Sequence, residues 1–340
     1  MTRRALATLL LSAAFISPAF AADAPVKPAD PVKPAPAAKP KAYIDPIQAA
    51  ADPDFGLQGE YAGDIKGDKR AIQLIALGDH KFHAVGYEGG LPGEGWDPTL
   101  QKWEADGALD HVTGILTITS DKGSGTIKDG LLTVTNPAGE KLGEMKKVTR
   151  QSPAMGAKPP EGAVILFDGK TNDFVPGKTD GELLTEGQNS KTKYQSITLH
   201  VEFMTPFMPA ARGQGRGNSG VYLQGRYECQ VLDSFGLKGE NNECGGLYTI
   251  AKPLVNMCYP PLTWQTYDID YTAAVYDGAK KTKNAIITVK HNGVEIHKDV
   301  ELPKGTTSAP VKEGAEPGPL HLQNHGNPVR YRNVWMVEKK

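Results

Sequence analysis

The fold and the candidate site are indicated most clearly by residues 216–234, which read R-G-N-S-G-V-Y-L-Q-G-R-Y-E-C-Q-V-L-D-S. This stretch begins as a Gly/Asn/Ser loop and continues as strand-like sequence with many polar groups. Side chains alternate between the two faces of a strand, so Arg226, Glu228 and Gln230 share one face. Asp233 lies near the strand end, where the alternation fades. Such a polar face either is solvated or lines a site for a polar ligand.

The sequence around this stretch, residues 161–340, is rich in strand signals. Strands are expected at residues 163–170, 196–204, 221–224, 226–232, 266–273, 285–297, 319–326 and 329–337. Asn292-Gly293 predicts a hairpin turn within one of these segments. No amphipathic helix of three or more turns is evident. Many short strands separated by turn residues predict a sandwich of jelly-roll type.

Residues 50–150 predict a separate, small all-β domain, whose role the sequence does not indicate. Strand signals recur at 72–77, 81–87, 114–120 and 131–135, and Asp129-Gly130 predicts a hairpin between two such runs. A Pro/Gly/Ala-rich linker at 151–160 separates this region from the jelly roll. The expected fold class is therefore all-β, with a β-rich domain preceding a sandwich.

The N-terminus has the pattern of an export signal. Arg3 and Arg4 precede an apolar core, and Ala19-Phe20-Ala21 fits a small-x-small cleavage pattern. We expect a signal peptide at 1–21, with an uncleaved anchor as the alternative. A Pro/Ala/Lys-rich tether follows at 22–49. The protein is then periplasmic or secreted, and no later segment is expected to span a membrane.

Overall charge argues against some partners. The formal net charge is −1, which gives no electrostatic case for binding nucleic acid or a membrane surface. Three cysteines are present, and Cys229 in mid-strand is expected to be a buried small hydrophobe. Cys244 and Cys258 lie in loop-like sequence and could form a disulfide in an exported protein, a question the sequence leaves open.

A second polar strand face lies near the C-terminus, where alternation places His321, Gln323 and His325 together. Two strands thus each present a titratable group beside an amide, as a sugar site requires. The alternative is that both are solvated faces of an ordinary sandwich.

The region from about 161 to 340 resembles the 3-keto-disaccharide hydrolase family, whose members are exported bacterial proteins with a concanavalin-like jelly roll. The resemblance rests on L-F-D-G-K (166–170), N-S-G-V-Y-L (218–223), Y-E-C-Q-V-L-D-S (227–234), W-Q-T-Y-D-I (264–269), V-K-H-N-G-V (289–294) and L-Q-N-H-G-N-P-V-R-Y-R-N-V (322–334), in this order. The region before 161 lies outside it. The segments 240–248 and 256–261 depart from the family pattern and predict a variant loop at the rim of the site.

The resemblance implies cleavage of 3-keto-glycosides, since a ketone at C3 of a sugar acidifies the proton at C2. A base removes that proton, the C1 substituent is eliminated, and water addition completes a net hydrolysis. This chemistry needs a general base, a group that stabilises the enolate and an acid for the leaving oxygen.

Site residues follow from the same resemblance. Glu228 or His325 is expected to act as base or acid, with Asp233 beside them. The expected substrate-binding residues are Arg226, Gln230, Gln323, Asn218, Trp264 and Tyr248. Arg226 or a divalent cation could stabilise the enolate, and Glu228, Asp233 and His325 could hold Ca, Mg or Mn.

Two other functions compete with this hydrolase. A non-catalytic carbohydrate-binding module uses the same fold and needs no titrating base. An ordinary endo-glucanase would need two carboxylates flanking the scissile bond, and the closely spaced glutamate pair of laminarinase-type jelly rolls is not found.

Overall fold

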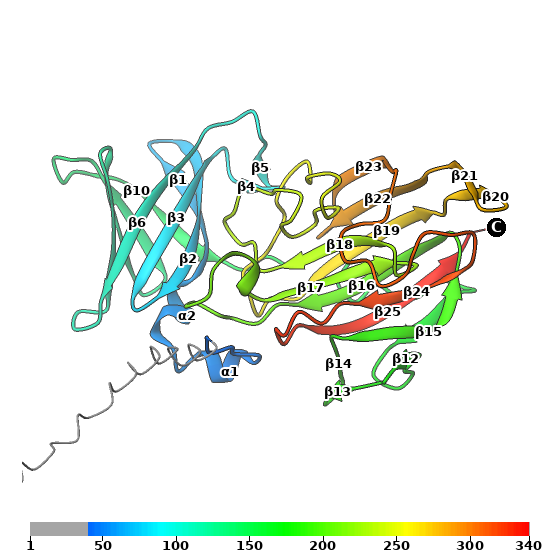
Figure 1. Ribbon diagram of the computed structural model, residues 1–340. Helices are drawn as coiled ribbons and strands as arrows, with labels where there is room; N and C mark the ends of the chain where they lie inside the picture. Colours follow the sequence, from blue (N-terminus) through cyan, green and yellow to red (C-terminus); the bar gives the residue numbers. More distant parts are fainter. Residues whose placement is uncertain (1–39, 340) are drawn as a thin grey trace, which may run out of the picture. The chain divides into compact units, whose positions relative to one another are not determined.

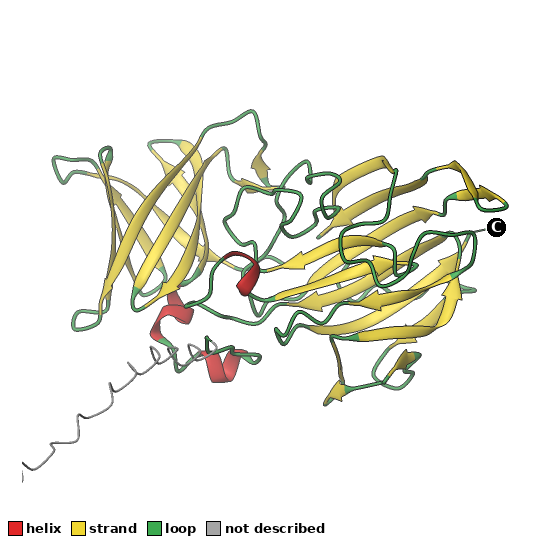
Figure 2. Ribbon diagram, in the orientation of Figure 1, coloured by secondary structure: helices red, strands yellow, loops and turns green. Residues whose placement is uncertain are grey.

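The computed structural model describes residues 40–339, which form an almost entirely β-structured body (Figures 1 and 2). The expected signal peptide and most of the expected tether lie outside the described residues. Tyr43, which was assigned to the tether, is buried and exchanges two backbone hydrogen bonds with Phe207. Two short helices follow, α1 (Pro46–Ala49) and α2 (Pro53–Leu57), each capped by the aspartate before it. The tether therefore ends before Tyr43, and the expected boundary at residue 49 is wrong.

Within residues 40–339, no helix has the length and apolar character needed to cross a bilayer.

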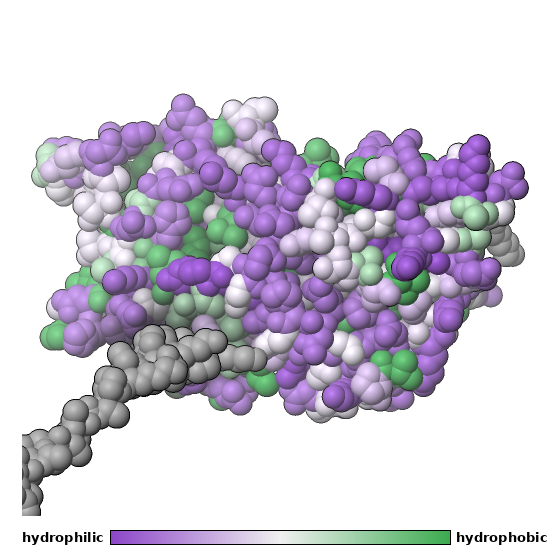
Figure 3. All heavy atoms as spheres, in the orientation of Figure 1, coloured by the Kyte–Doolittle hydropathy of each residue, from purple (hydrophilic) through white to green (hydrophobic). Residues whose placement is uncertain are grey.

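The region expected to be a small β domain closes on itself as a barrel. Its strands run in the closed order β1-β10-β9-β8-β7-β6-β3-β2. Their bounds are β1 (Gly59–Ile65), β2 (Asp68–Gly78), β3 (Lys81–Glu88), β6 (Lys102–Asp110), β7 (Ile115–Ser120), β8 (Gly123–Lys128), β9 (Leu131–Thr135) and β10 (Lys141–Val148), with a short pair β4 (Leu91–Pro92) and β5 (Gly95–Trp96) beside them. Hydrophobic side chains, green in Figure 3, show among hydrophilic ones on the barrel wall.

The predicted turns form where the sequence places them. Asp129 and Gly130 join β8 to β9 with φ of 50° and 77°, the left-handed pair that a two-residue hairpin turn requires. Asn292 and Gly293 do the same between β22 (Ala285–His291) and β23 (Val294–Leu302), with φ of 50° and 81°.

The C-terminal half is a sandwich of two antiparallel sheets, which confirms the predicted all-β, jelly-roll class. The large sheet runs β13-β14-β25-β16-β19-β22-β23, with β11 also paired to β25. Its other strands are β11 (Val164–Phe167), β13 (Thr179–Asp180), β14 (Leu183–Thr185), β16 (Ile197–Met204), β19 (Gln265–Thr272) and β25 (Arg330–Glu338).

The small sheet runs β12-β15-β24-β17-β18. Its strands are β12 (Phe174–Val175), β15 (Gln188–Tyr194), β17 (Asn218–Leu223), β18 (Tyr227–Leu232) and β24 (Gly318–Leu322). A hairpin of β20 (Val275–Asp277) and β21 (Lys280–Lys283) and the one-turn 3₁₀ helix η1 (Gly213–Gly215) lie outside both sheets.

The two sheets share one apolar core. Val221, Cys229 and Val231 of the small sheet are buried in it with Phe203 and Ile269 of the large sheet. Polar contacts also cross the core, because the Tyr331 hydroxyl donates to the Ser219 hydroxyl at 2.6 Å. One face of β17 and β18 is thereby fixed against the large sheet, and the opposite face is left for other contacts.

The expected linker at 151–160 is held against the large sheet by polar contacts. The Ser152 and Thr266 hydroxyls are 2.6 Å apart, and the Gly156 N–H donates to the Glu202 carboxylate at 2.6 Å. The same carboxylate accepts from Arg332 at 2.6 Å. The domain boundaries at 50–150 and 161–340 stay predictions.

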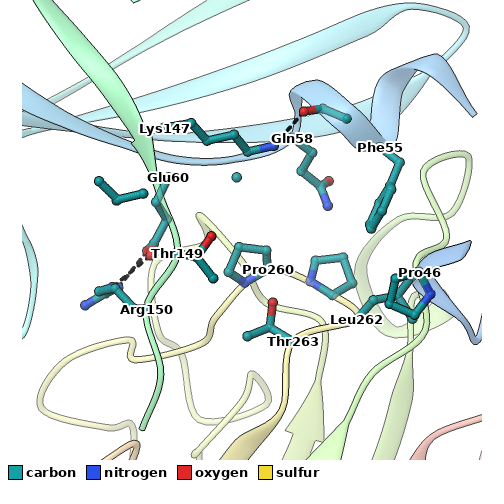
Figure 4. Close-up of a pocket in the computed structure, with 14 residues that line it drawn as sticks. Pro46, Phe55, Gln58, Glu60, Lys147, Thr149, Arg150, Pro260, Leu262 and Thr263 are labelled. Carbon is teal, nitrogen blue, oxygen red and sulfur yellow. Dashed lines mark hydrogen bonds and ion pairs between the residues drawn. The ribbon is translucent and has the colours of Figure 1, made fainter. Parts of the chain in front are cut away.

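A buried ion pair lies where the barrel strands give way to that linker. Arg150 donates to both Glu60 oxygens, at 2.6 and 2.7 Å, and to the Pro92 carbonyl at 2.7 Å. Glu60 also accepts from Gln73 at 3.0 Å. The pair helps to line a cavity of about 230 Å³, and Figure 4 shows Phe55 and Pro46 on the opposite side of the lining. Because both charges are buried and bonded to each other, each depends on the other.

Replacing Glu60→Ala should lower the free energy of unfolding by about 3–5 kcal/mol, because Arg150 would keep a buried charge without its counter-ion. Denaturant unfolding of the two proteins measures this difference. The control is Glu144→Ala, which removes an exposed pair with Lys141 at 2.6 Å and should change stability by about 0–1 kcal/mol. Equal effects of the two substitutions would contradict this account of the junction.

Candidate active site

The strand face that opened the sequence analysis lies on the side of the small sheet away from the core. β17 pairs with β18 and with β24, so the three strands lie side by side (Figure 1). Their outer side chains therefore share one face of the sheet. Tyr222 lies opposite Glu228 on one side and opposite His321 on the other. Leu320 and Leu322 point into the core. The predicted alternation of both polar strands is therefore confirmed as far as residue 322.

Glu228 is the most unusual group on this face. Its side chain is 2% exposed and lies over Gly220, where a Cβ would be only 2.1 Å from the carboxyl oxygen Oε1. A glycine is needed at this position because any side chain would occupy the space of the carboxyl group. Burial raises the pKa of Glu228 to about 8, although a hydrogen bond with Tyr222 opposes the shift. The group can therefore hold or release a proton near neutral pH.

Tyr222 connects Glu228 to the neighbouring polar groups. Gln323 donates to the Tyr222 hydroxyl at 3.0 Å, and the rings of Tyr222 and His321 meet edge to face with centroids 5.3 Å apart. His321 Nδ1 is 2.9 Å from Asn189 Oδ1. Burial lowers the pKa of His321, so its imidazole is uncharged at neutral pH. We call Tyr222, Glu228, His321 and Gln323 the acid–base cluster.

Tyr248 joins this cluster at its edge. Its backbone N–H donates to the Glu228 carbonyl at 3.3 Å, and its phenol is close enough to raise the pKa of Tyr222. The side chains of Tyr248, His321 and Gln323 are half-buried, whereas Glu228 is sealed. These three residues are therefore the partly exposed groups beside the buried carboxyl group.

Amide side chains continue the same face along β18. Gln230 donates to Gln214 Oε1 at 3.2 Å, and Asn218 donates to the same oxygen at 3.1 Å. Gln230 Oε1 and Asn218 Oδ1 are buried and have no hydrogen-bond partner within the described chain. Buried acceptors of this kind are normally bonded by protein groups or ordered water.

The Arg226 side chain bonds a neighbouring loop and does not share the strand face of Glu228 as expected. Its guanidinium donates to the Lys312 and Glu316 carbonyls, at 2.9 Å each, and to Gln224 Oε1 at 3.0 Å. β18 begins only at Tyr227, so the strand alternation does not reach Arg226. These hydrogen bonds fix the loop before β24, a structural role in place of the expected one at an enolate.

Asp233 and His325 also make contacts other than those expected of catalytic partners of Glu228. Asp233 is fully buried and pairs with Arg216 at 3.0 Å, and burial raises its pKa although Arg216 opposes the shift. β24 ends at Leu322, so His325 falls in an exposed turn with Nδ1 3.4 Å from Asn327. Among residues 40–339, no three His, Cys, Asp or Glu side chains gather as metal ligands would. The expected set of Glu228, Asp233 and His325 is therefore not brought together within the described residues.

Trp264 lies immediately before β19 of the large sheet, outside the acid–base cluster. The Arg332 guanidinium sits 4.0 Å from the centre of its ring, a cation–π contact. The ring also packs against the core of the barrel. This position supports a structural role for Trp264 in place of the expected sugar stacking.

The three cysteines are free and buried, which confirms Cys229 as a core residue. The disulfide considered between Cys244 and Cys258 is not formed. The two thiols instead share a hydrogen bond, and Cys244 Sγ also lies 3.2 Å from the Tyr267 hydroxyl. Hydrogen bonding within the core takes the place of the bridge.

Sequence reasoning missed Tyr222 and Gln214 and gave no role to His321. The signal for Tyr222 was present, because alternation through N-S-G-V-Y-L places Asn218, Gly220 and Tyr222 on one face. His321 was placed on the correct face, but His325 was preferred. Gln214 lies in η1, before the strand, and no periodic pattern predicts its position.

Comparison with known proteins assigns the family. The model of the 3-keto-alpha-glucoside-1,2-lyase-like domain matches residues 162–337, more than half of the chain, and the chain belongs to this family. Two solved structures from Parabacteroides distasonis, both described as candidate glycosyl hydrolases, are similar to part of it. One has 30% identity and a TM-score of 0.49, covering 53% of this chain and 85% of its own. The other has 16% identity and a TM-score of 0.36, covering 55% and 93%. No protein with curated annotation matches the chain.

Proposed function

We propose that this protein cleaves 3-keto-glycosides by removing the C2 proton, eliminating the C1 substituent and adding water to the product. Membership of the 3-keto-alpha-glucoside-1,2-lyase-like family supports a reaction at a keto sugar. The observation that carries the proposal is the pairing, across Tyr222, of a carboxyl group with raised pKa and an imidazole with lowered pKa. At neutral pH the pair supplies an uncharged acid and an uncharged base.

The roles follow from these protonation states. The His321 imidazole accepts the C2 proton, and the electron pair of the broken C–H bond forms the enolate of the C3 ketone. The Tyr222 hydroxyl and the Gln323 amide are the neighbouring donors for the enolate oxygen. Collapse of the enolate forms the C1=C2 bond and breaks the bond to the C1 oxygen, which takes the proton of Glu228. Water then adds its hydroxyl to C1 and a proton to C2.

The amide groups beside the cluster are assigned to substrate binding. Gln230 Oε1 and Asn218 Oδ1, which have no hydrogen-bond partner within the described chain, would accept hydrogen bonds from sugar hydroxyls. Tyr248, half-buried at the entrance, would contact the ring or the aglycone. Export to the periplasm or the medium, and any need for a divalent cation, remain predictions from the sequence.

The direct test is turnover of a 4-nitrophenyl 3-keto-glucoside beside the ordinary 4-nitrophenyl glucoside, with and without chelator. We expect nitrophenol release above the spontaneous rate from the keto sugar alone. His321→Ala and Glu228→Gln should each lower kcat by roughly 10²–10⁴-fold, the range for loss of an acid or base. His325→Ala is the matched histidine control and should keep the wild-type rate.

The other outcomes separate the alternatives. Binding of the keto sugar without release, over a range of pH and metals, would favour a carbohydrate-binding module. Release from the ordinary glucoside at a similar rate would indicate an ordinary glycosidase. Loss of activity with chelator would add a metal to the site, and wild-type rates for Glu228→Gln would remove Glu228 from the mechanism.

Gly220→Ala tests the close fit of the carboxyl group. The new Cβ would lie 2.1 Å from Glu228 Oε1 and 2.9 Å from Tyr222 Cε2, so the acid must move. We expect turnover of the keto sugar to fall by at least roughly tenfold, since small displacements of catalytic groups are costly. Gly215→Ala is the control, because its Cβ would have no neighbour within 4 Å. Full activity of Gly220→Ala would show that the fit does not matter.

A further inference from the structure

The interior of the barrel is filled at one end only. Directly opposed residues of an antiparallel pair share a face, so the pairings identify which side chains point inward. Tyr61, Phe82, Leu116 and Ile127 are among the inward residues and are at most 1% exposed. Phe207, from the sandwich half of the chain, belongs to the same buried cluster. This end of the barrel is an ordinary core.

Glycines occupy inward positions toward the other end. They are opposed by inward-facing partners: Gly63 by Met145, Gly86 by Ile72 and Trp103, Gly107 by Ile118, Gly125 by Val134, and Gly143 by Ile65. A Cβ at Gly63 would be 2.2 Å from the Glu144 carbonyl and one at Gly86 2.0 Å from the Trp103 ring, so these glycines allow neighbouring backbone and ring atoms to approach closely. A cavity of about 570 Å³ lies there, in the size range of a site for one small ligand. Eight-stranded barrels of other proteins hold single small ligands in the same place.

The wall of this cavity is mainly apolar. Ile72, Ile118, Leu132 and Met145 line it and are largely buried. Trp103 lines it too, with its indole against Gly86, where a Cβ would be 2.0 Å from the ring. The indole is half-buried, so one side of an aromatic wall remains available for contact with a ligand.

Charge at the lining of the cavity is balanced. The lining includes two positive side chains, Arg70 and Lys122, and two negative ones, Glu104 and Asp121. Arg70 forms an ion pair at 3.2 Å with Glu88, which is not part of the lining. A balanced rim gives no net attraction for an ion, whereas the apolar wall favours a molecule that removes it from water.

We propose that the barrel is a second binding site, separate from the acid–base cluster, for one uncharged and mainly apolar small molecule. The ligand enters at the glycine-rich end, and its body lies against Trp103, Ile118 and Met145. The site does not depend on the proposed cleavage of keto sugars, because none of its residues belongs to the acid–base cluster.

The experiment is a fluorescence titration of the full chain with N-phenyl-1-naphthylamine, an uncharged apolar probe that brightens when it leaves water. Ala105 lines the cavity on β6, whereas Ala108 on the same strand is exposed on the outside. Ala105→Leu places a larger side chain in the cavity, and Ala108→Leu is the matched control. We expect saturable binding with one probe per chain, at least tenfold weaker for Ala105→Leu and unchanged for Ala108→Leu.

Val134→Phe, at a second position in the lining, takes the place of Ala105→Leu if that variant does not fold, and should weaken the probe similarly. The proposal is overturned if the wild-type chain does not bind the probe. It is also overturned if filling the cavity at either position leaves the affinity unchanged, since the probe would then bind elsewhere.

Discussion

The candidate active site depends on one constraint, the burial of the Glu228 carboxyl group over Gly220 on the outer face of the small sheet. A carboxyl group that is 2% exposed favours its protonated form, because the effect of burial outweighs the hydrogen bond with Tyr222, which favours the charged form. Tyr222 is in turn fixed between Glu228 and His321 by the pairing of β17 with β18 and β24. Strand pairing therefore sets both the positions and the protonation states of the acid–base cluster.

The surrounding loops keep this face away from water. Arg226 binds the carbonyls of Lys312 and Glu316, and Thr306 accepts from the Glu228 N–H at 3.0 Å, so the segment before β24 is held beside β18. Arg216 and Asp233 form a buried pair near the other end of the strand. Three residues that the sequence suggested for chemistry or substrate binding, Arg226, Asp233 and Trp264, thus have structural contacts that account for them.

Period-two patterns predicted much of the fold, because alternation is a local property of each strand. The segments 131–135 and 196–204 are strands in the structure, and both Asx-Gly hairpins form. Alternation also gave the faces of Glu228 and His321. It failed at strand ends, where Arg226 and His325 leave the sheet. Barrel closure was not predicted, because β6, β8 and β10 include glycines and charged residues that weaken their strand signal and the closing contacts are long-range.

The most direct measurement is the free energy of unfolding against pH for the wild-type chain and Glu228→Gln. A folded pKa of about 8 against an ordinary value of 4.5 means that the native state holds the extra proton between these values. The contribution of Glu228 to stability is full below pH 4.5 and is lost as pH rises toward 8, at roughly 1.4 kcal/mol per pH unit. The wild-type chain should therefore lose stability relative to Glu228→Gln across this window. Parallel curves would contradict the account, because they would show a carboxyl group that titrates as it does in the unfolded chain.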